Sequence, residues 1–403
     1  MSLLSKIEGG GVTTASGFKA AGVKCGLKNN SYDLALLYSD KKACAAGVFT
    51  RNKFRAAPVI LSEGRIQNSI QAVVINSGNA NACTGQRGLS DAEEMARYAG
   101  SLLQVDAENV LIASTGVIGC YLPMDKIKKG IAKAVANLSS EGGKNAAHAI
   151  MTTDTVHKET AYRGTANGKH FVIGGMAKGS GMICPDMATM PCFLTTDVSI
   201  ERNLLQETLG KAVERTFNMI TVDGDTSTND MVLVLANGSN NSVKVQSRDS
   251  DELNIFYEAL LKCCRDLAVQ IVADGEGATK LIHLIVRGAA DFYSGKAIAR
   301  SILNSLLVKT AFFGEDANWG RIIMAAGNAG VDFSPEKVDV FLGDLQVAAN
   351  GSGLVFDEAR AKKILEKKEI SVVIDLNMGS EEVEAWGCDL SYDYVRINGS
   401  YRS

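Results

Sequence analysis

The densest group of residues able to do chemistry lies at positions 178–190, which read KGSGMICPDMATM. Glycines permit a tight loop here, and a lysine, a serine and a threonine lie among them. The segment is not a phosphate-binding P-loop, because that motif needs its lysine after the second glycine and Lys178 precedes both. Nor is it the nucleophile elbow GxSxG, since residues 178–181 read KGSG.

The pair Ala188 and Thr189 within this segment permits a different reaction. A threonine that follows a small residue can attack the preceding carbonyl in an N-to-O acyl shift, and hydrolysis of the ester leaves the threonine as a new N-terminus. Its α-amino group, with an ordinary pKa of about 7.7–8.0, can then serve as general base for its own hydroxyl. Taken alone, the local pattern favours an ordinary glycine-rich loop over this chemistry.

A second group follows an apolar run at residues 113–119, which read ASTGVIG. The Gly116 amide beside the Thr115 hydroxyl would supply the two donors of an oxyanion hole, which stabilise a carbonyl oxygen as it gains charge. The competing interpretation is a simple turn that ends a strand.

Three polar loops could bind a ligand: residues 76–81 (NSGNAN), 223–230 (DGDTSTND) and 274–280 (DGEGATK). The second lacks the spacing and the bidentate glutamate of an EF-hand, so calcium is a minor interpretation. The four histidines show neither HxxxH nor HExxH spacing, which gives catalytic zinc no support. These loops are more typical of residues that tie the fold together, or that bind the charged ends of an amino acid.

The elements that must position these groups follow from hydrophobic periodicity and capping signals. Residues 90–93 read SDAE, a capping box that predicts a helix over 90–103, and other helices are expected over 125–138, 199–218, 250–272, 294–309 and 357–368. Strands are expected over 72–76, 110–114, 171–176, 231–236, 281–286, 338–342 and 370–375. The absence of a strict βαβ rhythm favours a layered α+β or α/β sandwich over a barrel. We expect a nucleophile-bearing layered domain at residues 1–283 and a smaller α+β domain at residues 284–403.

Composition points to work on a small molecule. The 403 residues carry a net charge of −3, which provides no basic field for nucleic acid or anionic lipid. No stretch is apolar enough to span a membrane, and no secretory leader follows Met1. The nine cysteines are odd in number and irregular in spacing, as expected for reduced thiols in a cytoplasmic protein.

Taken together, these segments resemble the ornithine acetyltransferase / glutamate N-acetyltransferase family of arginine biosynthesis. The likeness runs along the whole chain in order, so it is far more specific than any one motif. The matching segments are residues 17–23, 46–50, 75–85, 114–119, 151–155, 178–190, 274–280, 318–321 and 394–398.

The resemblance implies a role for individual residues. Thr189 is then the nucleophile, freed by self-cleavage after Ala188 into an α chain of residues 1–188 and a β chain from 189. Thr115 and Gly116 match the oxyanion-hole pair of the family. The matching substrate-binding positions are Thr152, Lys178, Thr189, Glu276, Asn398 and Ser403. Ser403 stands where the family more often has threonine, and its place at the C-terminus implies a tail that returns to the active site.

The implied activity is transfer of an acetyl group from N-acetylornithine to glutamate through an acetyl-threonine ester, giving ornithine and N-acetylglutamate. The implied fold is self-processing and resembles that of N-terminal-nucleophile enzymes, and the implied assembly is a heterotetramer of two α and two β chains. Neither a metal nor a coenzyme is expected. No residue decides whether acetyl-CoA also serves as an acetyl donor.

Two other functions fit the same residues. A self-processed N-terminal-threonine amidase or aminopeptidase would use the same nucleophile with water as acceptor. A non-enzymatic amino-acid-binding protein would use the polar loops alone and would have no reason to cleave itself.

Overall fold

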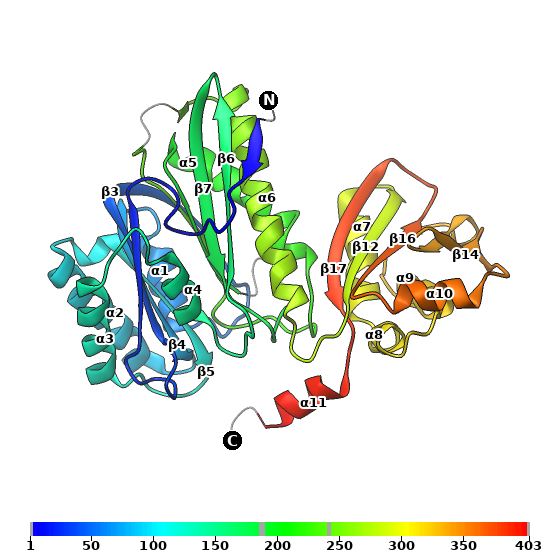
Figure 1. The fold of residues 1–403 in the computed structure, drawn as a ribbon, viewed down its shortest axis with the longest axis horizontal. Helices are drawn as coiled ribbons and strands as arrows, with labels where there is room; N and C mark the ends of the chain where they lie inside the picture. The colour runs from blue at the N-terminus through cyan, green and yellow to red at the C-terminus, as the bar shows by residue number, and fades with distance from the viewer. Residues whose placement is uncertain (1–2, 185–189, 240–242, 401–403) are drawn as a thin grey trace. The chain divides into compact units, whose positions relative to one another are not determined.

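A computed structural model of the chain describes residues 3–184, 190–239 and 243–400. The chain folds into two compact units (Figure 1). Unit 1 comprises residues 1–179, 185–218 and 226–271, and unit 2 comprises residues 180–184, 219–225 and 272–403. The division after residue 283 and the split of the chain at residue 188 stay predictions.

Unit 1 is built on a nine-stranded sheet in the order β1-β6-β7-β8-β10-β3-β4-β5, with β2 also paired to β3. The pairs β4–β5 and β8–β10 are parallel, and the other pairs are antiparallel. The strands are β1 (Leu4–Lys6), β2 (Phe18–Val23), β3 (Leu34–Phe49), β4 (Ile70–Asn79), β5 (Val110–Val117), β6 (Lys158–Ala166), β7 (Lys169–Ala177), β8 (Pro191–Thr196) and β10 (Met231–Ala236).

Helices cover both faces of this sheet because its central strands are apolar on both sides. Along β4, Ala72 and Val74 pack in one hydrophobic cluster with α2 (Gly85–Leu103) and α3 (Met124–Ala136). Val73 and Ile75 point the other way, into a cluster that contains residues of α4 (Gly143–Ile150). Unit 1 also contains α1 (Ala57–Arg65), α5 (Arg202–Glu214), most of α6 (Asp251–Ala273), and the short pair β9 (Ser199–Ile200) and β11 (Lys244–Val245).

Unit 2 has a six-stranded sheet in the order β15-β14-β13-β16-β12-β17, on which α7 packs against β12 and β17. The strands are β12 (Leu281–Ala289), β13 (Asp339–Leu342), β14 (Leu345–Ala349), β15 (Ser352–Gly353), β16 (Glu369–Asp375) and β17 (Glu381–Cys388). The helices are α7 (Phe292–Asn304), α8 (Leu306–Phe313), α9 (Trp319–Gly327), α10 (Glu358–Leu365) and α11 (Tyr392–Gly399).

The layered α+β class predicted from the sequence is confirmed, and each of the seven expected strands is found. Within the described residues, no helix combines the length and the apolar character needed to cross a membrane.

Three helix predictions were wrong in detail. The proposed capping box at residues 90–93 lies inside α2, which begins five residues earlier, where Thr84 and Asn81 pack closely against Gly88. The expected helix over 199–218 begins only after β9, because the Glu201 carboxylate caps α5 by accepting from the amides of Asn203 and Leu204. The expected helix over 294–309 is two helices, because Ser305 is extended and its hydroxyl caps α8.

Candidate active site

Thr115 and Gly116 lie at the carboxyl end of β5, where this strand runs parallel to β4. Thr115 is buried. The Asn229 side chain holds the end of β5 in place by donating a hydrogen bond to the carbonyl of Ser114 (2.8 Å). Gly116 has φ +133°, which side chains other than glycine rarely adopt, and a Cβ there would overlap Gly78. The close approach of β4 and β5 at this point therefore requires glycine.

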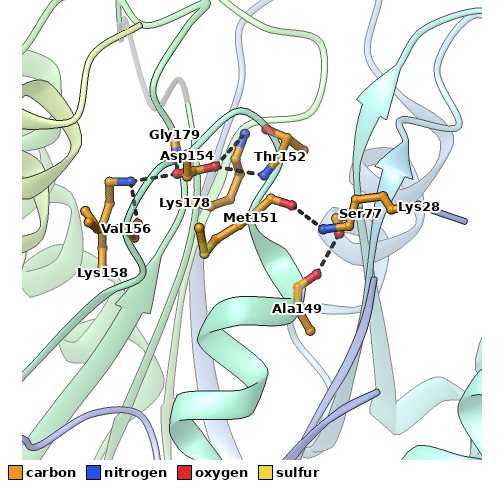
Figure 2. A network of polar contacts seen from close by, with 10 residues as sticks. All are labelled: Lys28, Ser77, Ala149, Met151, Thr152, Asp154, Val156, Lys158, Lys178 and Gly179. Carbon is orange, nitrogen blue, oxygen red and sulfur yellow. Dashed lines mark hydrogen bonds and ion pairs between the residues drawn. The ribbon is translucent and has the colours of Figure 1, made fainter. Parts of the chain in front are cut away.

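Asp154 is the centre of a buried polar network between α4 and β7, drawn in Figure 2. Its carboxylate accepts from Lys158 Nζ at 2.7 Å and from the amides of Gly179 at 2.6 Å and Thr152 at 2.8 Å. Lys178 Nζ lies 4.0 Å from the same carboxylate. One buried anion thus holds together two segments that carry predicted substrate contacts, the loop at Thr152 and the end of β7 at Lys178.

The surrounding charges keep Asp154 ionised although burial opposes it. Burial raises its pKa, but the cations Lys178 and Lys158 and the Gly179 amide outweigh that effect and bring the pKa to about 2. Both Asp154 and Lys158 have fully buried side chains. An ion pair of this kind is costly to break on one side only, because the remaining charge stays buried.

Two further contacts fix the loop that precedes Asp154. Lys28 Nζ donates to the carbonyl of Met151 (2.7 Å), and Ser77 Oγ donates to the carbonyl of Ala149 (2.6 Å), as Figure 2 shows. Burial lowers the pKa of Lys28. Because Ser77 lies in β4 next to the strand of Thr115 and Gly116, these bonds connect the predicted oxyanion donors to the loop of Thr152.

Asp230, directly before β10, is a second buried carboxyl near Lys178, and its pKa is shifted in the opposite direction to that of Asp154. Burial raises its pKa well above the ordinary value, against an opposing effect of Lys178, and its Oδ2 has no hydrogen-bond partner in the part of the chain that is described. The next residue, Met231, donates its amide to the carbonyl of Met190 (3.3 Å), the residue that follows Thr189 in the sequence. Lys178 therefore has two buried carboxyls in its surroundings whose pKa values are shifted in opposite directions.

In unit 2, Glu276 and Asn398 contact each other. Asn398 Nδ2 donates to Glu276 Oε2 at 2.8 Å, and the Glu276 amide donates to the carbonyl of Ser180 at 2.8 Å. A Cβ at Gly181 would overlap the Glu276 carboxylate, so this glycine lets the segment 180–184 approach. The C-terminal helix α11 thus reaches the predicted substrate residue Glu276.

Asp223 provides a second connection between α11 and the segment 180–184. Its carboxylate accepts from the amides of Met182 (2.6 Å) and Ile183 (2.8 Å), and Tyr394 Oη donates to it at 3.2 Å. A Cβ at Gly277 would lie 2.5 Å from the amide nitrogen of Tyr394. Helix α11 is therefore held next to residues 182 and 183, which precede the predicted cleavage segment.

The sequence-predicted residues fall into three groups. In unit 1, Thr152 and Lys178 meet around Asp154, and Thr115 and Gly116 lie on the adjoining strand β5. In unit 2, Glu276 and Asn398 are hydrogen-bonded. Ala188, Thr189 and Ser403 lie outside the described residues, and every role assigned from the sequence stays a prediction.

Sequence reasoning assigned no role to Asp154 or Lys158, and it named Asp223 only as part of the polar loop 223–230. The spacing of Asp154 and Lys158, four residues apart, is an available signal for an ion pair, but it is common on exposed surfaces, and only the fold reveals the burial. Among the described residues, no group of three or more His, Cys, Asp or Glu side chains could hold a metal ion.

Comparison with known proteins gives a consistent result along the chain. The model of the ArgJ family matches residues 19–403. The arginine biosynthesis bifunctional protein ArgJ of Symbiobacterium thermophilum is 52% identical over 398 residues, covering 98% of this chain and 99% of that protein. Its namesake from Caldanaerobacter subterraneus subsp. tengcongensis is 49% identical over 403 residues, covering 99% of this chain and all of that protein.

A solved structure agrees. The crystal structure of arginine biosynthesis bifunctional protein ArgJ from Bacillus halodurans is 45% identical, with a TM-score of 0.50, and covers 52% of this chain and 98% of that chain. On a match that spans nearly its whole length, the chain described here belongs to the ArgJ family.

Proposed function

We propose that the chain is an acetyltransferase of arginine biosynthesis, which moves an acetyl group from N-acetylornithine to glutamate. The observation that carries the proposal is the full-length match to relatives named arginine biosynthesis bifunctional protein ArgJ. The buried network around Asp154 supports it, because it fixes Thr152 and Lys178 just before the segment that contains Thr189.

The first reaction is self-cleavage. The Thr189 hydroxyl oxygen attacks the carbonyl carbon of Ala188, the C–N bond breaks, and the peptide nitrogen becomes an amine. Water then hydrolyses the ester, leaving a carboxylate on Ala188 and a free α-amino group on Thr189. The products are the chains 1–188 and 189–403.

The second reaction is acetyl transfer in two steps. The Thr189 amine takes the proton of its own hydroxyl, and the oxygen attacks the acetyl carbonyl of N-acetylornithine. Ornithine leaves with that proton, and the acetyl group remains as an ester on Thr189. The amine of glutamate attacks the ester, which releases N-acetylglutamate and restores Thr189. Neither metal nor coenzyme is needed.

Thr115 and Gly116 are proposed to stabilise the oxyanion that forms in each step. One such donor contributes about 2.7–4 kcal/mol of transition-state stabilisation. The positive φ of Gly116 and the burial of Thr115 support this role, because both fix the direction of the donors before substrate binds. Lys178, Glu276 and the other positions implied by the resemblance are proposed to bind the charged ends of the substrates.

An intact-mass spectrum tests both reactions. The purified protein should give two chains of the masses of 1–188 and 189–403, and incubation with N-acetylornithine should add one acetyl group to the second chain. Thr189→Ala should give a single uncut chain without an acetyl group. Thr310→Ala, an exposed helical threonine, is the matched control and should behave as the wild type. A cleaved and active Thr189→Ala protein would exclude the proposal.

The acceptor separates transfer from hydrolysis. If the enzyme is an acetyltransferase, loss of the acetyl group from Thr189 should require glutamate, whereas an amidase would release acetate in its absence. Acetyl-CoA in place of N-acetylornithine tests the second donor, and light scattering tests the proposed assembly of two α and two β chains.

A further inference from the structure

Unit 1 contains a cavity of 880 Å³ that is separate from the residues assigned to acetyl transfer. Its walls come from the segment after β1, the turn before α4, the first residues of β6, and Gln270 of α6. The register of β1 with β6 ends at Lys6 and Tyr162, Ile7 still donates its amide to the carbonyl of Ala161 (2.8 Å), and a turn closed by the Gly10 amide and the Ile7 carbonyl follows. Figure 1 shows the N-terminal strand beside β6.

Two consecutive glycines bring the backbone close to β6 at this cavity. A Cβ at Gly10 would lie 2.6 Å from Cβ of Ala161, and a Cβ at Gly11 would overlap Oε1 of Glu159. Oε1 of Glu159 also lies 3.5 Å from the position of a Cβ on Gly143. The Glu159 carboxylate, whose side chain is 15% exposed, therefore lies close to glycine backbones and lines the cavity.

This carboxylate lacks a strong partner among the residues that the structure describes. The nearest ionisable nitrogen, His157 Nε2, is 3.7 Å away, beyond hydrogen-bond distance. Burial raises the pKa of Glu159 to about 7, opposed by Lys144. Burial and the neighbouring His148, whose ring centroid is 4.3 Å from that of His157, lower the pKa of His157, so near pH 7 its ring is largely neutral.

The remaining charged groups of the cavity leave an excess of carboxylates. Glu8 and Glu141 also line it, whereas Lys6 Nζ is paired with Asp266 at 2.7 Å. Lys144 is the other lysine that lines the cavity, and this residue is exposed to solvent.

We propose that this cavity is a binding site for a small organic cation, whose primary ammonium or guanidinium group donates hydrogen bonds to Glu159. A charged donor satisfies a desolvated carboxylate better than a neutral one does. The cavity volume is that of ordinary small-molecule sites. A metal ion is disfavoured, because in the described part of the chain no three metal-ligating side chains come together. The proposal does not depend on the acetyltransferase activity.

The pKa of Glu159 links binding to pH. A cation binds the ionised form, so the affinity should rise as pH rises through about 7 and level off above it. At pH 7 about half of the molecules carry the proton, and binding should release about half a proton per site. Lys144 and His157 lie near the same carboxylate, and His148 lies against His157. None of the three reverses this sign, because a bound cation also disfavours their charged forms.

The test is a titration of the full chain with n-butylammonium, followed by saturation-transfer NMR and by calorimetry in two buffers of different ionisation enthalpy. We expect a Kd on the order of millimolar for so small a ligand. Tetramethylammonium, which has no N–H donor, should bind at least tenfold more weakly. Butylguanidinium tests the second form of the cation.

Two variants test the site itself. Glu159→Gln keeps the shape and removes the charge, and it should weaken binding at least tenfold and abolish the proton release. Gly11→Ala keeps the charge but displaces the carboxylate, and its matched control is Gly64→Ala, whose new Cβ would meet no described atom within 4 Å. Unchanged binding in Glu159→Gln refutes the proposal. The proposal is also refuted if the Lys178→Met variant no longer binds the cation while the Glu159→Gln variant still does. The cation would then occupy the proposed acetyl-transfer site.

Discussion

The most informative single substitution in unit 1 is Lys158→Met, because it removes one member of a fully buried ion pair. Methionine retains the length and apolar stem of lysine, so the change removes mainly the charge. Asp154 would keep its bonds to the amides of Thr152 and Gly179, but its closest cation at 2.7 Å would be absent.

The cost can be estimated from burial. Removing one partner of a buried pair costs about 3–5 kcal/mol, since the remaining charge is left uncompensated. The exposed pair Lys19 and Asp40 has nearly the same separation, 2.8 Å, yet both side chains are more than 40% exposed. Lys19→Met should therefore change the free energy of unfolding very little, because water and salt screen an exposed pair. The contrast between the two lysines isolates the effect of burial.

The assay is urea unfolding of both variants, monitored by circular dichroism. The m value, which is the dependence of the unfolding free energy on urea concentration, should be the same in both variants if the unfolded state is unchanged. The double variant Asp154→Asn/Lys158→Met completes a cycle and should be less destabilised than the two single variants added together. If Lys158→Met loses no more stability than Lys19→Met, the reasoning that this pair is a buried structural centre is wrong.

Two more predictions follow from the site. The folded pKa of Asp154 is about 2, against an ordinary value of 3.8, so the group contributes on the order of 2 kcal/mol of stability above pH 4, which is lost as pH falls through 2. Asp154→Asn should lack this acid-dependent step in unfolding experiments between pH 4 and 2. Gly116→Ala should lower acetyl transfer about a hundredfold, because the strained φ and the overlap with Gly78 misplace the proposed oxyanion donors. The control Gly210→Ala, with open space for its Cβ within a helix, should retain full activity; a Gly116→Ala enzyme as active as this control would contradict the role.

The elements that could be predicted from the sequence are those with strong local signals. The apolar strand at 231–236 and the helix at 250–272 were found within a residue or two, because hydrophobic periodicity decides both. The 16-residue strand β3 was missed, since its exposed stretch Asp40–Lys42 interrupts the apolar pattern. That stretch lies at a register shift in the pairing of β3 with β4, between Tyr38 opposite Ala72 and Ala43 opposite Ile70, and the pairing of β3 with β10 follows it.

In the candidate site, too, only the residues with a local sequence signal could be predicted. Local sequence placed Thr115 and Gly116 directly after a strand at 110–114, and the structure includes both in that strand, which continues to Val117. The burial of Lys158 could not be predicted, because a lysine four residues after an aspartate is usually a solvated surface pair. The attachment of α11 through Tyr394 and Asp223 joins residues 171 positions apart, which no local pattern can reveal.

The position of β8 in the sheet has a consequence for the proposed cleavage. This strand begins two residues after Thr189, and it is paired on one side with β7 and on the other with β10. Cleavage before Thr189 would therefore produce two polypeptides that share one continuous sheet, with β7 from the first and β8 from the second. They could separate only by unfolding, so a purification tag on either piece should recover both, and a denatured mixture would have to rebuild the sheet between two molecules.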